Sequence, residues 1–73
     1  MSRLPQVSGN ELIGALTRAG FEVAGQRGSH VKLRTAERVV IVPIHGSTPL
    51  RKGTLRAILR DAGIGVSEFV DLL

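Results

Sequence analysis

One of the two histidines in this 73-residue chain, His30, lies among residues that could act on a phosphate ester. The stretch RGSHVKLR, residues 27–34, places His30 next to a Gly–Ser pair and alternates it with Lys32 and Arg34. Histidine has an unperturbed pKa of about 6.5, so it can serve as a general acid or base near neutrality. Neighbouring cations would stabilise negative charge that develops on phosphorus. The residues alone leave three roles open for His30: catalysis, contact with RNA, or an ordinary surface position.

RNA would suit such a site because it carries its own nucleophile, the 2′-hydroxyl. A protein then has to supply only proton transfer and phosphate stabilisation. The adjacent Ser29 must point to the opposite side of a strand from His30, which argues against a Ser–His nucleophilic pair. The chain has no cysteine and two histidines, and almost no carboxylates lie near them, which is too poor a ligand set for a metal. We therefore expect no metal site and no cofactor.

Basic residues are concentrated in the middle of the chain. The net charge is +4, yet Glu37 is the single acidic residue between Arg27 and Arg60. Three of the basic residues recur at every fourth position, which would make one stripe on a helix: Lys52, Arg56 and Arg60. The free N–H groups at the start of that helix would also favour phosphate. A basic segment in a small domain indicates a polyanion, most often nucleic acid, and the alternative is a solvated basic face.

Helix-capping signals predict two main helices and a short third one. Ser8 and Glu11 have capping-box spacing before an apolar face, and Gly20 ends that helix because glycine tolerates a left-handed conformation. Gly63 ends the second helix, over TLRAILRDA, in the same way. A short terminal helix is predicted to begin with Ser67 as its N-cap.

Between the two main helices the apolar period changes from 3.6 to 2, which predicts three strands in FEVAGQ, SHVKLRT and RVVIVPI. In the first strand, Phe21 and Val23 alternate with Glu22 and Gln26. The predicted connections, RGS and TAE, are too short for parallel strands, so the sheet should be antiparallel. We expect one α+β domain over residues 1–73, with the main helices on one face of a three-stranded antiparallel sheet.

Strand parity predicts which side chains lie on the open face of that sheet. If Val31 and Leu33 point to the helices, then His30, Lys32 and Arg34 point outward together. The third strand is apolar on both faces and lies at an edge, where an uncovered apolar strand promotes aggregation. Either the terminal helix or a protein partner could cover it.

Three longer stretches, GFEVAGQRGSHVKLR, VVIVPIHG and LRKGTLRAILRDAGI, resemble those of HicA-type toxins, the small ribonucleases of bacterial toxin–antitoxin pairs. The resemblance extends over nearly the whole chain. It implies a double-stranded-RNA-binding-domain-like fold, α-β-β-β-α, with a short C-terminal helix. It also implies metal-independent cleavage of mRNA, with His30 of the Gly28–Ser29–His30 motif as the catalytic residue and His45 as a candidate second group. Lys52 departs from the pattern, because relatives often have proline there.

The resemblance implies a HicB-type antitoxin protein as the partner that covers the active face. We thus predict an enzyme, an endoribonuclease toxin that inhibits translation, whose RNA contacts are Gly28, Ser29, Lys32, Arg34, Lys52, Arg56 and Arg60. One rival is a non-catalytic double-stranded-RNA-binding module of the same fold, and another is a subunit whose basic face docks an acidic protein. No apolar stretch approaches the roughly 20 residues of a membrane span, so we expect a cytoplasmic protein without membrane contact.

Overall fold

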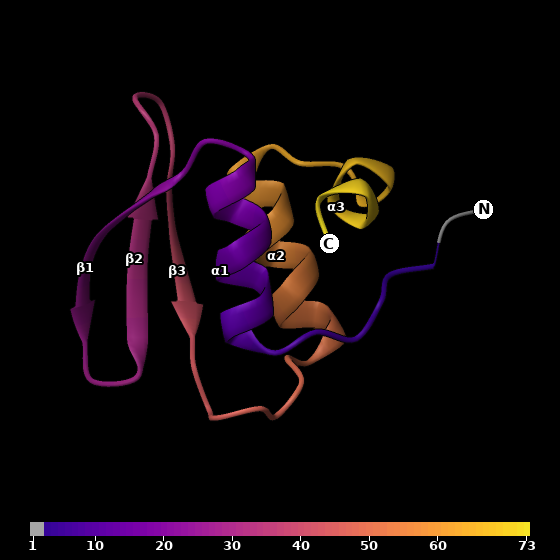
Figure 1. The fold of residues 1–73 in the computed structure, drawn as a ribbon, viewed down its shortest axis with the longest axis horizontal. Helices are drawn as coiled ribbons and strands as arrows, with labels where there is room; N and C mark the ends of the chain where they lie inside the picture. The colour runs from indigo at the N-terminus through magenta and orange to yellow at the C-terminus, as the bar shows by residue number, and fades with distance from the viewer. Residues whose placement is uncertain (1–2) are drawn as a thin grey trace.

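The computed structural model describes residues 3–73 as one three-stranded sheet with three helices (Figure 1). In chain order the elements are α1 (Gly9–Arg18), β1 (Glu22–Arg27), β2 (His30–Arg34), β3 (Val39–Pro43), α2 (Lys52–Ala62) and α3 (Val66–Leu72). The strands are antiparallel in the order β1-β2-β3. The predicted α+β architecture, α-β-β-β-α with a short C-terminal helix, is confirmed. The prediction of a single domain over 1–73 stays a prediction, and residues 1 and 2 lie outside the described part.

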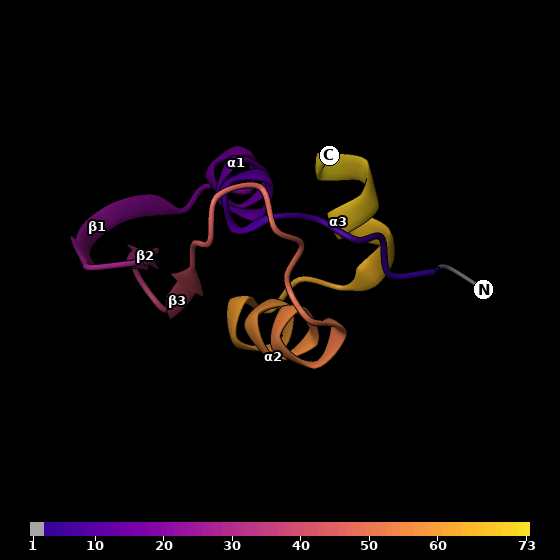
Figure 2. The ribbon, with the colours of Figure 1, turned by 90° about the horizontal axis from the view of Figure 1, so that it is seen from below.

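Both main helices lie to one side of the sheet, and the other face is open (Figures 1 and 2). α1 contacts β1 and β3, whereas α2 packs against β3. The core fills the space between these elements, and its largest fully buried side chains are Leu12, Leu16, Leu33, Val42, Leu55 and Phe69. These residues come from the apolar faces of the helices and from the inward positions of β2 and β3, so the open face carries only the outward side chains of the strands.

Capping interactions set the helix ends close to the predicted positions. The Ser8 N–H donates to Glu11 Oε1 (2.9 Å) and the Glu11 N–H donates to Ser8 Oγ (3.2 Å), which completes the predicted capping box. Gly20 has a φ of 103°, and the Phe21 N–H donates to the Leu16 carbonyl (2.9 Å), as in a Schellman motif. Gly63, with a φ of 72°, ends α2 similarly.

The predicted start of the terminal helix was wrong, and of the two alternatives for covering β3 the terminal helix is excluded. Gly65, not Ser67, is the N-cap of α3, because the Phe69 N–H already bonds to the Gly65 carbonyl (2.9 Å). α3 packs on α1, on the side of the helices away from the sheet (Figure 2). It therefore does not cover β3, whose outward Val39 and Ile41 remain 53% and 46% exposed.

A β-bulge in β1 changes the predicted alternation of that strand. Val23 pairs with Leu33, but Gly25 pairs with Lys32, so Ala24 is an extra residue on β1. Residues beyond the bulge therefore exchange faces relative to a regular strand. The expectation that Gln26 shares a face with Glu22 was wrong.

A tight hairpin joins β1 to β2. Its loop has two residues, Gly28 and Ser29. Arg27 was predicted to lie in the turn but is the last residue of β1. Gly28 takes a positive φ of 58° while Ser29 does not, which is the glycine-first arrangement of type II′ hairpins. Arg27 and His30 consequently face each other as the last pair of the β1–β2 ladder.

Candidate active site

His30 is the first residue of β2 and lies on the open face of the sheet. The strand alternates exposed and buried positions, with Val31 and Leu33 buried and His30, Lys32 and Arg34 exposed. The predicted parity of this strand is therefore confirmed. His30 pairs with Arg27 of β1 on one side and with Pro43 of β3 on the other.

The open face is hollowed beside His30. The residues that line this hollow, called the His30 hollow below, are Gly25, Gln26, Arg27, His30, Lys32 and Ile41. Gly25 lies directly across from Lys32, and nothing approaches within 4 Å of a Cβ built on it. Because Gly25 has no side chain, the open face of the sheet is left uncovered at this position.

Within residues 3–73, the cations of the His30 hollow form no ion pair. No carboxylate lines the hollow, and the single ion pair in the part of the chain that the structure describes joins Arg60 and Asp61. Gln26 Nε2 donates to the Gly28 carbonyl (3.0 Å) and so braces the hairpin. Free cations beside a histidine make a local positive potential that attracts a phosphate group.

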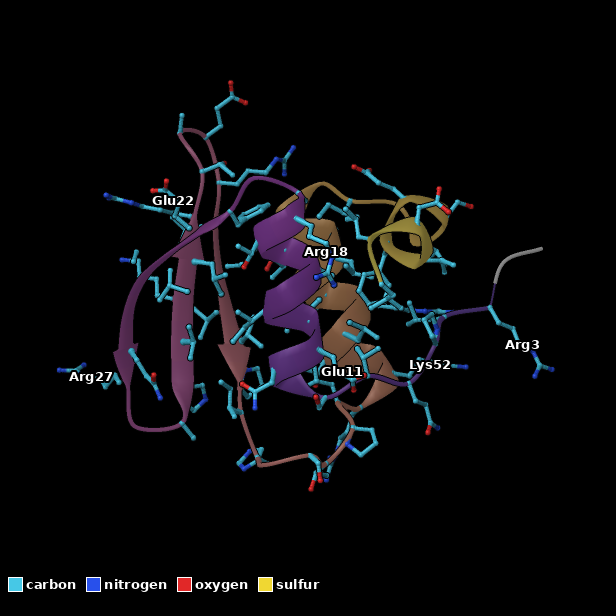
Figure 3. The ribbon with its side chains drawn as sticks, in the orientation of Figure 1. Arg3, Glu11, Arg18, Glu22, Arg27 and Lys52 are labelled. Carbon is cyan, nitrogen blue, oxygen red and sulfur yellow. The ribbon has the colours of Figure 1, made fainter. Side chains whose placement is uncertain are left out.

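Arg27 is the site residue that sequence reasoning missed. It was assigned to the turn, yet it lines the same hollow as His30 and extends the basic group to the outer edge of the sheet (Figure 3). A two-residue hairpin loop that begins with glycine pairs the residues on either side of it. The Gly28–Ser29 pair was visible in the sequence, so the pairing of residues 27 and 30 could have been predicted.

Arg34 lies apart from the His30 hollow. It lines a separate depression with Gly20, Glu22, Thr35 and Ala36, and Glu22 faces it across the strand pair. Four residues along a strand separate Arg34 from His30, which corresponds to roughly 13 Å. Arg34 could therefore contact a distant part of a polyanion but not the group held at His30.

His45 lies in the loop between β3 and α2 and lines a different hollow. Its carbonyl accepts a hydrogen bond from the Thr48 N–H (3.0 Å), which folds the loop into a turn. The hollow beside it is shared with Pro43, Thr48, Arg51 and Thr54, among other residues. The hollow at His30 and the hollow at His45 share no lining residue.

The three cations of α2 are exposed, opposite the buried face of Leu55, Ile58, Leu59 and Ala62. Arg60 Nε lies 3.8 Å from the Asp61 carboxylate, whereas Lys52 and Arg56 form no ion pair with any residue in 3–73. Figure 3 shows Lys52 and Arg27 on opposite sides of the molecule. The stripe and the His30 hollow therefore do not form one compact pocket, and a polyanion that touches both has to cross the protein.

Two negative findings apply to residues 3–73. No group of three or more His, Cys, Asp or Glu side chains is arranged so that it could hold a metal ion. No helix there is long and apolar enough to cross a membrane.

Comparison with known proteins identifies the family. A family model described as the HicA toxin of bacterial toxin–antitoxin systems matches residues 9–64, which is well over half of the chain. The match runs from α1 to just beyond α2 and includes His30, His45 and the α2 cations, whereas α3 lies outside it. A search of curated proteins found no match. The chain therefore belongs to the HicA family, the toxins of bacterial toxin–antitoxin systems, and this membership implies a cognate antitoxin as its partner.

Proposed function

We propose that the protein is an endoribonuclease that cleaves mRNA and so inhibits translation in the cytoplasm. The observation that carries this proposal is the His30 hollow, in which an exposed histidine lies with Arg27 and Lys32 and without any carboxylate. Membership in a toxin family supports an activity that harms the cell. A surface that only bound RNA would need the cations but no titrating group among them.

The proposed reaction uses the RNA as its own nucleophile. The 2′-oxygen attacks the adjacent phosphorus, the bond to the 5′-oxygen of the next nucleotide breaks, and a 2′,3′-cyclic phosphate remains. His30 carries out one of the two proton transfers, from the 2′-hydroxyl or to the leaving 5′-oxygen. Arg27 and Lys32 stabilise the charge on the pentacoordinate phosphorus, so no metal takes part. His45 is the candidate for the other transfer, although it lines a neighbouring hollow.

The proposed RNA contacts extend beyond this hollow. Within the hairpin loop, Gly28 and Ser29 are exposed and adjoin His30, so backbone groups there can approach a phosphate. Arg34 and the α2 stripe, Lys52, Arg56 and Arg60, are proposed to contact phosphates farther along the strand. These contacts would position the RNA and would not select its sequence.

We also propose that the cognate antitoxin is of the HicB type and that it covers the open face of the sheet. Val39 and Ile41, which are 53% and 46% exposed, lie on that face beside Arg34 and Lys32. A partner with a surface that is acidic and apolar would match both features and exclude RNA. The proposal thus explains why apolar side chains remain exposed on β3 without cover from α3.

The test is cleavage of a labelled mRNA by the purified protein and by His30→Ala. The side chain is exposed, so the free energy of unfolding should change by no more than about 0.5 kcal/mol. Cleavage should fall by roughly 100-fold or more, whereas RNA affinity should fall only modestly because the cations remain. A chelator should leave the wild-type rate unchanged, and growth arrest on expression should be lost in the variant.

Two results would contradict the proposal. If wild type and His30→Ala cut RNA at equal rates, the activity does not depend on His30. If neither cuts any RNA while both bind it, the protein is the non-catalytic RNA-binding module that its fold also allows.

A further inference from the structure

We infer that the hollow at the start of α2 is a second phosphate site, which holds the phosphodiester next to the one at His30. It is formed by side chains of the β3–α2 loop and of the first turn of α2, and is called the Arg51 hollow below. Its polar side chains are His45, Thr48, Arg51 and Thr54. This inference deepens the proposed ribonuclease function and rests on it.

The chemistry of the Arg51 hollow suits a phosphate. Arg51 offers a planar guanidinium with paired donors that match phosphate oxygens, and the threonine hydroxyls can donate as well. No Asp or Glu is among the described residues that line the hollow. Arg51 forms no ion pair and no side-chain hydrogen bond in residues 3–73. Its donors are therefore available to a ligand.

The Arg51 hollow adjoins the His30 hollow through the end of β3. Pro43 pairs with His30 and also lines the Arg51 hollow. The Ile44 N–H donates to the Ser29 carbonyl (2.7 Å), so the ladder continues one step past Pro43 and His45 follows directly. Pro43 and His45 are two residues apart, which corresponds to roughly 6.6 Å along an extended segment, so the Arg51 hollow begins one strand position across from His30. One RNA strand that runs past Pro43 can therefore place successive phosphates in the two hollows.

The start of α2 adds to these side chains. Arg51 is the N-cap of this 11-residue helix, and its side chain makes no capping hydrogen bond. The first N–H groups of a helix lack intrahelical acceptors and carry a partial positive charge. They reinforce a site that the loop side chains already define.

The test uses the full chain and a short RNA that wild type cuts once, together with two copies of that RNA. Each copy carries an uncharged methylphosphonate at one of the two phosphates that flank the cleaved bond. Arg51→Ala should raise KM by roughly 10-fold, the effect of losing a charged hydrogen bond, with kcat changed by less than about 2-fold. On the RNA whose methylphosphonate replaces the phosphate that Arg51 holds, the wild type and Arg51→Ala should have the same KM, because the charged contact is already lost.

Arg3→Ala is the control for net charge, because it also removes one exposed positive charge and Arg3 lines neither the Arg51 hollow nor the His30 hollow. If Arg3→Ala and Arg51→Ala raise KM equally, the effect is one of net charge and the site is overturned. It is also overturned if the Arg51→Ala defect persists on both methylphosphonate RNAs.

A separate measurement distinguishes failure of this site from failure of the cleavage proposal. If the wild type cuts no RNA, the binding of the same oligonucleotide is measured by fluorescence anisotropy, with a methylphosphonate placed at each position in turn. A roughly 10-fold loss of affinity in Arg51→Ala that disappears at one methylphosphonate position supports the site without cleavage. Equal affinities of Arg51→Ala and Arg3→Ala at every position overturn it.

Discussion

Gly25 lies opposite Lys32 and contributes no side chain to the open face at the point where the His30 hollow forms. Its φ is not in the left-handed region, and nothing lies within 4 Å of a Cβ built on it. Glycine is therefore not required there by the backbone or by packing. The space that it leaves is available to RNA.

Replacing this glycine tests whether RNA uses that space. Gly25→Val should leave the free energy of unfolding unchanged or raise it by up to about 1 kcal/mol, because glycine weakens strands. A side chain forced against bound RNA costs about 1–3 kcal/mol, so kcat/KM for RNA cleavage should fall by roughly 10-fold or more. Gly65→Val, at an equally open position beside α3, is the control. Normal cleavage by Gly25→Val would show that RNA does not enter the His30 hollow.

Among the elements, α1 and α3 support the site from the far side of the sheet. Gly9 is buried at the start of α1, and a Cβ there would lie 2.3 Å from the Pro43 carbonyl oxygen. α1 therefore begins in direct contact with Pro43 at the end of β3, the residue that pairs with His30. This contact fixes the position of β3 relative to the helices.

α3 lies outside the family match, yet it contributes to the core. Phe69 is fully buried, and Arg18 Nε donates to the Leu72 carbonyl, which ties the helix to α1. Phe69→Ala should lower the free energy of unfolding by about 3–5 kcal/mol, because it leaves a cavity in a small core. Val70→Ala, at a 43% exposed position of the same helix, should change it by about 0.5 kcal/mol or less. Chemical denaturation measures both, and equal losses would mean that α3 is not part of the cooperative core.

At the scale of the whole molecule, the basic groups lie on two sides of a small protein. The salt dependence of RNA affinity should show how many of these groups contact the RNA. Each phosphate contact with single-stranded nucleic acid adds roughly 0.7 to the slope of log K against log salt concentration. Replacing both Lys52 and Arg56 by alanine should weaken binding and reduce that slope by roughly 1.4. Titrations at several salt concentrations measure this, with Arg3→Ala as a control outside the stripe. An unchanged slope would remove the α2 stripe from the RNA footprint.

Local interactions explain which features of the fold could be predicted from the sequence. The Ser8–Glu11 capping box and the glycine-ended helices depend on residues within one turn of each other. The alternation of β2 depends on side-chain parity within one strand, so the outward position of His30 with Lys32 followed from the sequence. The resemblance to HicA toxins also came from the sequence and is confirmed by the family match.

Pairing and packing between distant segments decided the rest. The extra residue Ala24 is visible only in the register of β1 against β2, and that register turns Gln26 away from the face of Glu22. α3 packs on α1 because Phe69 fills the core there, a contact between residues far apart in the chain. His45 lines a hollow with Arg51 and Thr54 from the start of α2 and not the hollow at His30. A periodic pattern describes one segment at a time, so none of these contacts between segments could be read from the sequence.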